Sequence, residues 1–177
     1  MSFWKESCFS RPDTMTTDES ERCYAAAIRI LNYRFNSEAE LRRKLRRKQF
    51  EAPLVDETID RLRREKWLDD KRFAAAFVRT KQQKHHGPRK IAMELAATGV
   101  DRDAAKQVLR ESSNPEKERE DAVALFEKRR RLLIRRHGEE YVLTDEARRK
   151  LAAYLLNQGY DSALVQSVVK EIPVVDD

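Results

Sequence analysis

The chain has 177 residues, 38 % of them charged, and a formal net charge of +6. Gly and Pro are scarce, and the strong helix formers Ala, Leu, Arg, Lys and Glu dominate, so the composition indicates an all-α protein. Two cysteines are too few for a disulfide framework or a four-ligand zinc site, and no apolar stretch suits a membrane span or a signal-peptide core, so we expect a cytoplasmic protein.

Residues 1–17 mix aromatic and polar side chains at no regular period, which predicts a flexible tail, although Phe3, Trp4 and Phe9 could instead dock on a neighbour. From about Asp18 onward, apolar periodicity predicts nine helices in three groups of three, each a long leading helix followed by a pair. The groups span 18–67, 68–113 and 114–172, and a frayed end follows at 173–177. We therefore expect an elongated array of three tandem three-helix repeats.

The paired helices of each group carry one apolar pattern, displaced by fifty and then sixty positions with unchanged internal spacing. The pattern is Ile91, Leu95, Gly99, Val100, Ala105 and Leu109 in the middle copy, Leu41, Leu45, Gln49, Phe50, Val55 and Ile59 in the first, and Leu151, Leu155, Gly159, Tyr160, Val165 and Val169 in the last. Gly99 and Gly159 suit a left-handed turn between the helices. Gln49 would need to accept a strain of about 1–2 kcal/mol there, or end its helix differently.

Helix-start signals mark the boundaries within this array. Ser37 and Glu40 form a capping box, and Pro53 and Pro88 suit the first helical turn. The expected N-caps of later helices are Asp69, Asp101, Thr144 and Asp161. The helix that begins near Asp69 should stop at His86-Gly87.

Cations gather in two runs, 42–48 and 128–136, and recur at equivalent repeat positions as Arg89-Lys90 and Arg149-Lys150. A cation repeated at one structural position makes a stripe, which suits a polyanion or an acidic protein surface. The candidate partner-binding residues are Arg42, Arg43, Arg46, Arg47, Lys48, Arg89, Lys90, Arg129, Arg130, Arg131, Arg135, Arg136, Arg149 and Lys150. For both runs, a solvated face without a partner stays the alternative, and Leu132, Leu133 and Ile134 must also pack.

Catalytic and metal sites are disfavoured, so we expect no enzyme activity and no cofactor. The pair His85-His86 points in two directions on a helix, and no third ligand completes a metal shell. The adjacent carboxylates of Asp69 and Asp70 do not indicate a catalytic pair. Asp69 is expected to cap the next helix, and Asp70 suits the first turn of that helix, where a negative charge favours the helix dipole. No phosphate-binding loop, nucleophile elbow or catalytic triad order occurs.

Three motifs in order carry a family resemblance that spans about residues 22–172. This sequence resembles the RecX family of recombinase regulators in Ser37-x-x-Glu40-Leu41-x-x-Lys44-Leu45, Leu68-Asp69-Asp70-Lys71-Arg72-Phe73-Ala74 and Gly87-Pro88-Arg89-Lys90-Ile91-x-x-Glu94-Leu95-x-x-x-Gly99-Val100. Where that family usually has Gly-Phe at the end of the first and last repeats, this chain has Gln49-Phe50 and Gly159-Tyr160.

The resemblance implies binding in the helical groove of the RecA nucleoprotein filament, bridging its subunits. Such binding would restrain ATP hydrolysis, strand exchange and SOS repressor cleavage, and so regulate recombination, DNA repair and the SOS response. We expect a monomer with no membrane association. The alternative is a sequence-independent nucleic-acid-binding protein that competes for DNA, since weak nonspecific DNA contact suits the cations. Recognition of a specific DNA sequence by a helix-turn-helix motif is disfavoured. In that motif the start of the second helix contacts the bases, whereas here the second helix of each pair starts with acidic or neutral residues.

Overall fold

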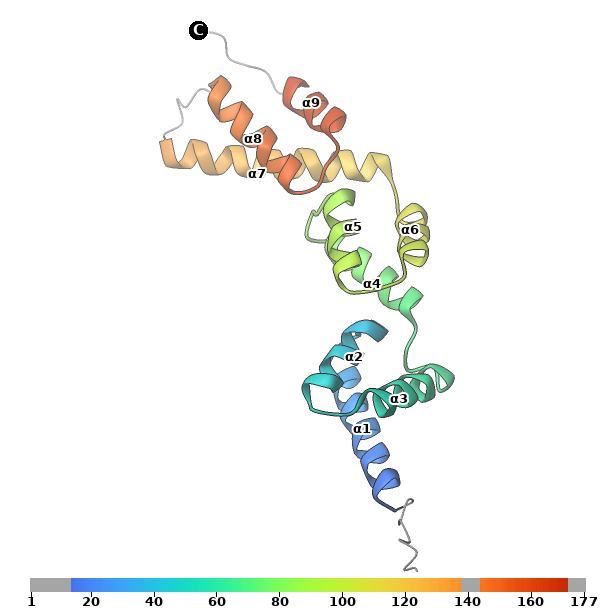
Figure 1. Ribbon diagram of the computed structural model, residues 1–177. Coiled ribbons are helices and arrows are strands. Elements are labelled where there is room, and N and C mark those ends of the chain that lie inside the picture. The colour runs from blue at the N-terminus through green and yellow to red at the C-terminus, as the bar shows by residue number, and fades with distance from the viewer. Residues whose placement is uncertain (1–13, 138–143, 172–177) are drawn as a thin grey trace, which may run out of the picture. The chain divides into compact units, whose positions relative to one another are not determined.

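The computed structural model describes residues 14–137 and 144–171, and all regular structure within them is helical (Figure 1). Its helices are α1 (Thr14–Tyr33), α2 (Glu38–Arg47), α3 (Ala52–Arg64), α4 (Asp70–Gln82), α5 (Pro88–Ala97), α6 (Arg102–Glu111), α7 (Pro115–His137), α8 (Asp145–Asn157) and α9 (Ser162–Glu171). The predicted all-α class with nine helices is confirmed over these residues.

Two terminal predictions fall wholly or partly outside the described residues. The expected frayed end 173–177 lies outside them, and so do residues 1–13 of the expected tail. Residues 14–17 of that tail are instead helical, because α1 begins at Thr14 rather than near Asp18.

The chain divides into two compact units, Met1–Asp69 and Asp70–Asp177. In the first unit, α1, α2 and α3 enclose one core, and α2 buries only Leu41 and Leu45 of its own residues. The core comprises Cys23, Ala27, Leu41, Leu45, Val55, Ile59, Leu62 and Leu68. Ser37 starts α2 as expected, since its side chain accepts a hydrogen bond of 3.1 Å from the Glu40 amide.

The turn between α2 and α3 contains Gln49 in the left-handed conformation, with φ of 68°. Gly99 and Gly159 occupy the matching turns with φ of 82° and 91°. Of the two outcomes open to Gln49, the structure therefore shows the strained one. All three repeats use the same helix ending, and only the first carries a side chain there.

The second unit contains two further cores. Helices α4, α5 and α6 surround Phe73, Ala74, Val78, Ile91, Leu95, Val100, Ala105 and Val108. Helices α7, α8 and α9 surround Ala122, Phe126, Ala147, Leu151, Leu155, Tyr160, Val165 and Val168. The expected caps at Asp101, Thr144 and Asp161 are present, each accepting backbone N–H bonds of 2.8–3.3 Å at the start of its helix.

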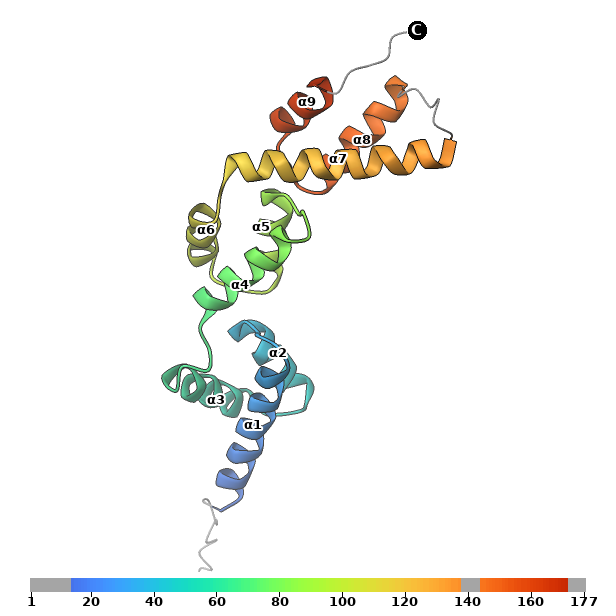
Figure 2. The same cartoon turned by 180° about the vertical axis from the view of Figure 1, so that it is seen from behind.

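Backbone hydrogen bonds join the start of α5 to the turn between α8 and α9, which lie close together in both views (Figures 1 and 2). Gly87 donates to the Gln158 carbonyl at 2.7 Å, and Arg89 donates to the Gly159 carbonyl at 3.1 Å. A Cβ atom on Gly87 would lie 2.4 Å from the Gly159 carbonyl carbon. The glycine is therefore needed for this close approach.

The expectation that α4 continues to His86-Gly87 is wrong, because the helix ends at Gln82. The chain turns at His85, which has φ of 55°, and the His86 amide donates to the Lys81 carbonyl at 3.1 Å. This ending redirects the backbone so that Gly87 reaches the α8–α9 turn.

We predict that Gln49→Gly stabilises the first unit by about 0.5–1 kcal/mol, because relief of strain exceeds the added freedom of the unfolded chain. Tryptophan fluorescence during urea unfolding measures this, since Trp67 lies in the first unit and no tryptophan follows it in the sequence. The control Glu57→Gly, at an exposed position within α3, should destabilise by about 1 kcal/mol. Destabilisation by Gln49→Gly would contradict the strain argument.

Gly87→Ala should destabilise the second unit by about 1–3 kcal/mol, because the added methyl group collides with backbone that cannot move independently. Circular dichroism during urea unfolding measures the loss, and hydrogen exchange at the Gly87 and Arg89 amides shows whether the junction opens. Gly99→Ala is the matched control at an exposed left-handed turn, with a cost of only about 1 kcal/mol. Equal effects of the two changes would refute the close-approach argument.

Candidate partner-binding surfaces

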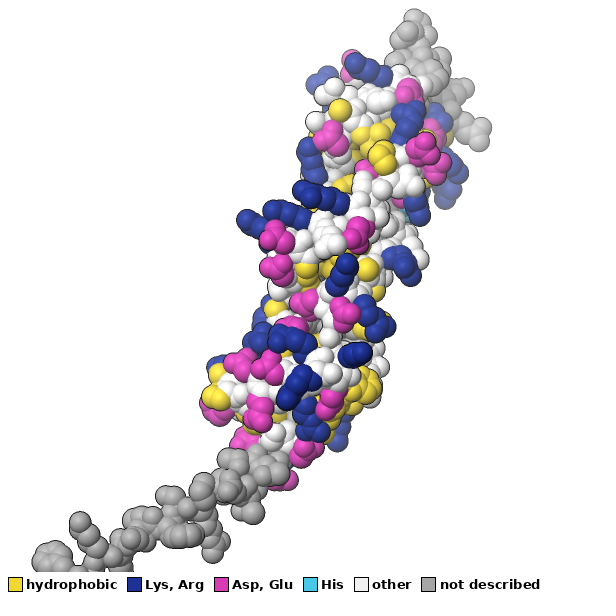
Figure 3. All heavy atoms as spheres, turned by 90° about the vertical axis from the view of Figure 1, so that its right-hand side faces the viewer, with side chains coloured by type: hydrophobic (Ala, Val, Ile, Leu, Met, Phe, Trp, Pro, Cys, Tyr) yellow, Lys and Arg dark blue, Asp and Glu magenta, His cyan; other side chains and the backbone are white. Residues whose placement is uncertain are grey.

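Several arginines of the first unit are neutralised by carboxylates of α1, α2 and α3. Arg42 binds Asp56 at 2.9 Å, and Arg63 binds Glu38 at 2.6 Å. One of these paired arginines is the candidate residue Arg42. The basic run 42–48 therefore offers a partner less positive charge than its sequence suggests. On the face shown in Figure 3, basic and acidic side chains are likewise interspersed.

Other cations of α1 and α2 have no carboxylate within 4.0 Å among the described residues. We name this group the α1–α2 basic face, and it consists of Arg22, Arg29, Arg43, Arg46, Arg47 and Lys48. All six are exposed at the surface, and α2 turns only Leu41 and Leu45 inward. Four of them were candidates from the sequence.

The α1–α2 basic face is hollowed by three adjoining grooves of about 790, 310 and 540 Å³. The largest is lined by Arg34, Ala39, Glu40, Arg42, Arg43, Lys44, Arg46 and Arg47. It shares Lys44 with the second groove, which in turn shares Ala26, Arg29 and Lys48 with the third. The cations therefore line a connected surface and do not project singly into solvent.

Lys44 lies at the point where two of these grooves meet. Its ammonium donates to the Asn36 side-chain oxygen at 2.5 Å. Burial lowers the pKa of Lys44, and the neighbouring Arg34 guanidinium lowers it further. A lysine whose proton is disfavoured by adjacent positive charge indicates an electropositive groove.

Exposed aromatic rings border the same surface. Tyr33 lines the second groove and is 90 % exposed, and Phe35 is 62 % exposed in the connection to α2. The sequence reasoning missed these two rings, together with Arg22 and Arg29. The seven-residue spacing of the two arginines along α1 was the available signal, since it places them on one helix face.

In the second unit, α7 and α8 bring three of the candidate cations together. Arg129, Arg136 and Lys150 line a cleft of about 380 Å³. The Arg129 guanidinium lies 5.2 Å from the centre of the Tyr154 ring, over its face. Lys150 is also bound to Glu146 at 2.7 Å, and this bond lowers the pKa of the Glu146 carboxyl.

The other candidates on α7 and α8 do not converge on this cleft. Arg130 is bound to Glu127 at 3.1 Å, while Arg131, Arg135 and Arg149 are exposed. Among the apolar residues of this run, Leu133 packs on the core and Leu132 is 45 % exposed.

Arg89 and Lys90 are engaged within the second unit. Arg89 forms an ion pair with Asp161, and the Lys90 ammonium donates to the Gln158 side chain at 3.0 Å. At the matching repeat positions, Arg149 is instead exposed on α8, and Lys150 lines the α7–α8 cleft. Equivalent sequence positions thus meet different surroundings, and partner binding by Arg89 and Lys90 stays a prediction.

His85, which follows α4, takes part in the same junction. His85 Nδ1 lies 2.8 Å from the Asp121 carboxylate of α7, and the Tyr160 hydroxyl donates to the His85 carbonyl at 3.0 Å. Within residues 14–137 and 144–171, no group of three or more His, Cys, Asp or Glu side chains is placed to hold a metal ion. Nor is any helix of those residues long and apolar enough to cross a bilayer.

Comparison with known proteins identifies the family. Models of the first and second three-helix domains of RecX match residues 23–62 and 69–109, which cover most of the first two helix groups. A regulatory protein RecX from Trichlorobacter lovleyi is 33 % identical over 158 residues, covering 88 % of this chain and 98 % of the relative. The chain belongs to the RecX family.

Other members of the RecX family differ in length from this chain. The regulatory protein RecX of Halalkalibacterium halodurans is 31 % identical over 89 % of this chain, which spans only 57 % of that relative. The crystal structure of RecX from Lactobacillus salivarius matches with a TM-score of 0.72 and 25 % identity, covering 88 % of this chain and 97 % of that one. A second RecX crystal structure, at 23 % identity, has a TM-score of 0.76 and supports the fold alone.

We predict that His86 titrates below its ordinary pKa of 6.5, because burial disfavours its charged form and the ammonium groups of Lys90 and Lys81 oppose its protonation. A lowered folded-state pKa means that the second unit loses stability as the pH falls below about 6.5. An NMR titration of the imidazole measures the shift. Glu94→Gln should lower the pKa further, because the Glu94 carboxylate favours the charged imidazole.

The matched control for this titration is Glu146→Gln, which removes a carboxylate paired with Lys150 on α8. It should leave His86 unchanged. An imidazole that titrates at or above the ordinary value would contradict the burial argument.

Proposed function

We propose that this protein regulates RecA, mainly as an inhibitor, by binding in the groove of the RecA–DNA filament and bridging its subunits. In this way it restrains ATP hydrolysis, strand exchange and RecA-assisted cleavage of the SOS repressor. Membership of the RecX family supports the proposal, since relatives matched over most of this chain are regulatory proteins. The protein acts by binding, without catalysis of its own.

The observation that carries the proposal is the α1–α2 basic face, whose cations have no acid partner among the described residues. A nucleoprotein filament offers phosphates and acidic side chains at regular intervals, and unpaired cations gain most from such a target. The second unit contributes its own cations in the α7–α8 cleft. Two linked units that each bind weakly achieve a high combined affinity for a polymer with repeated sites.

We predict that the double reversal Arg46→Glu, Arg47→Glu weakens filament binding on the order of tenfold or more, because two attractive contacts become repulsive. Both side chains are exposed, so helicity and unfolding should change little. The measurements are RecA-dependent ATP hydrolysis on single-stranded DNA and co-sedimentation with filaments.

A matched control is Arg102→Glu, Arg110→Glu on α6, which makes the same change of charge at exposed positions. It should retain more inhibition than the α2 variant. Failure of the unmodified protein to inhibit ATP hydrolysis or to sediment with filaments would refute the proposed function. Unaltered inhibition by the α2 variant would place the interface elsewhere.

A second candidate function is sequence-independent binding of nucleic acid, with competition for DNA as its effect on RecA. The exposed rings of Tyr33 and Phe35 favour it, because bases of a single strand stack on such rings while neighbouring cations hold the phosphates. Base-specific reading fits less well, because α6 begins behind Asp101 and the α1–α2 basic face lies on the helices that precede α3.

Tyr33→Ala combined with Phe35→Ala should reduce affinity for a bare single-stranded oligonucleotide about tenfold or more if this second function operates, because stacking contributes about 1–3 kcal/mol per base. Fluorescence anisotropy at several salt concentrations measures binding and its salt slope. Filament binding that persists at a salt concentration where bare-DNA binding is lost would decide for the filament-based function.

A further inference from the structure

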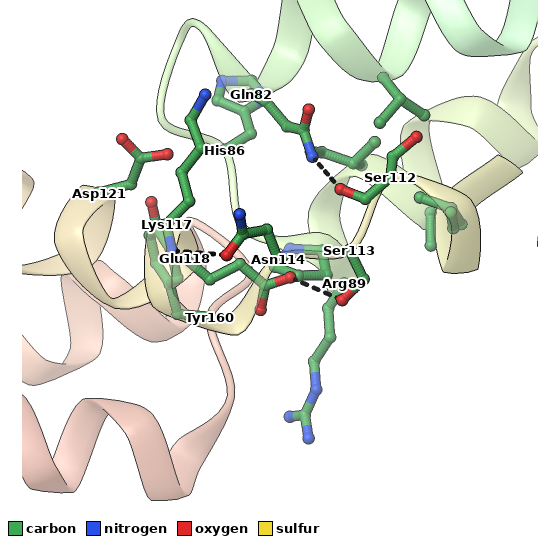
Figure 4. Close-up of a pocket in the computed structure, with 15 residues that line it drawn as sticks. Gln82, His86, Arg89, Ser112, Ser113, Asn114, Lys117, Glu118, Asp121 and Tyr160 are labelled. Carbon is green, nitrogen blue, oxygen red and sulfur yellow. Dashed lines mark hydrogen bonds between the residues drawn. The ribbon is translucent and has the colours of Figure 1, made fainter.

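Two hollows of this protein differ in the charge that surrounds them. The second unit contains a cavity of about 270 Å³ at the connection from α6 to α7 (Figure 4). Lys117 lies at its rim together with the carboxylates of Glu118 and Asp121, so this cavity is bordered by both signs of charge. The largest groove of the first unit, of about 790 Å³, is instead lined by six cations and one carboxylate. That groove therefore attracts anions.

Three arginines of the groove are available to an anion. Arg34 and Arg42 are each paired with a carboxylate, at 3.0 and 2.9 Å. Arg43, Arg46 and Arg47 have no carboxylate within 4.0 Å among the described residues. A guanidinium group binds phosphate through paired N–H donors, so a small phosphorylated molecule suits this groove.

Lys44 also lines the groove, and its ammonium has a neutral hydrogen-bond partner. It donates to the Asn36 side-chain oxygen at 2.5 Å. Asn36 is buried, and its side-chain nitrogen donates to the Arg34 carbonyl at 2.6 Å, which fixes the direction of its oxygen. Glu40 lies one helical turn before Lys44, but its carboxylate is bound to Arg34 at 3.0 Å. Lys44 therefore lacks a bound carboxylate that would favour its charged form.

The surroundings of Lys44 also favour its neutral amine. Burial lowers the pKa of Lys44, and the guanidinium groups of Arg34 and Arg47 lower it further, while Glu40 opposes them. A lower pKa means that more of the side chain is uncharged at a given pH, and only the uncharged amine is a nucleophile. Lys44 lines the second groove as well, so its amine is reached from two grooves.

We propose that Lys44 is acylated by small acyl phosphates without the help of an enzyme, and that this modification weakens filament binding by the α1–α2 basic face. The arginines hold the phosphoryl group, and the neutral Lys44 amine attacks the acyl carbon. The bond from that carbon to the phosphate oxygen breaks, and the oxygen keeps the electron pair and takes a proton from the amine. The products are an amide at Lys44 and inorganic phosphate.

The modification changes the groove in two ways. It removes one positive charge, and it adds an acyl group where two of the grooves meet. The loss of binding rests on the proposed function, because it requires that the α1–α2 basic face contacts the filament. The acylation of Lys44 itself needs no RecA.

The first experiment compares two lysines within one peptide. The full chain is incubated with acetyl phosphate and cleaved after glutamate, which releases residues 41–51 with Lys44 and Lys48 together. Mass spectrometry should find Lys44 acetylated about fivefold faster than Lys48, which does not line the largest groove. Phenyl acetate, an acyl donor without phosphate, should show about half this preference or less.

A variant tests the contribution of the arginines. Arg47→Gln should slow acetylation of Lys44 about threefold or more, because the phosphoryl group loses a partner and the Lys44 ammonium loses a repulsive neighbour. Arg64→Gln makes the same change at an exposed position of α3 that lines none of the three grooves. This matched control should leave the rate unchanged.

The second experiment measures co-sedimentation with RecA filaments before and after treatment, at a dose that modifies Lys44 with little change at Lys48. Treated protein should bind about threefold more weakly than untreated protein, because a cation of the groove is lost. Lys44→Arg keeps the charge and cannot be acylated in this way. Its binding should therefore be the same before and after treatment.

Each outcome decides one part of the proposal. Equal acetylation of Lys44 and Lys48, or an equal preference with phenyl acetate, would overturn the modification site. Acetylation of Lys44 with unchanged filament binding, or an equal loss of binding in treated Lys44→Arg, would overturn its regulatory role. Failure of the untreated protein to bind filaments would refute the proposed function and the regulatory role with it, while the mass spectra still decide the modification site.

Discussion

The close approach of two backbone segments, Gly87 against the Gly159–Tyr160 turn, is the constraint on which the second unit depends. Because a methyl group at Gly87 would lie 2.4 Å from the Gly159 carbonyl carbon, the distance between the segments is set by the absence of a side chain. The two hydrogen bonds across this contact join the α4–α6 core to the α7–α9 core. The same contact brings Tyr160 beneath the cavity at the α6–α7 connection, where its hydroxyl donates to the His85 carbonyl.

Pairing of charges, more than their number, distinguishes the surfaces of this protein. The chain has 37 basic and 31 acidic residues, so carboxylates are abundant enough to neutralise most cations. The α1–α2 basic face is notable because Arg43, Arg46 and Arg47 lack such partners, whereas Arg42 on the same helix is bound to Asp56. A surface ion pair contributes little to stability, but it removes an arginine from competition for an external anion.

Both units present cations for the proposed filament binding. The α1–α2 basic face suits a polymer of repeated negative charge, where each contact is weak and depends on salt. The α7–α8 cleft of the second unit adds its own cations, Arg129, Arg136 and Lys150.

The sequence by itself determined the helical class, the threefold repeat, the caps at Ser37, Asp101, Thr144 and Asp161, and the resemblance that led to the RecX family. These features depend on interactions within a few residues, such as apolar periodicity and a side chain that caps the next turn, so a single sequence displays them. Only the tertiary structure decided that α4 ends at Gln82 and that Gln49 accepts a left-handed conformation. It also separated Arg89 and Lys90, which bind the α8–α9 turn, from Arg149 and Lys150, which occupy the same repeat position on α8. The reason is that these outcomes depend on residues that are distant in the sequence. Arg89 and Asp161, for example, lie some seventy positions apart. A local sequence pattern carries no information about which distant residues will meet.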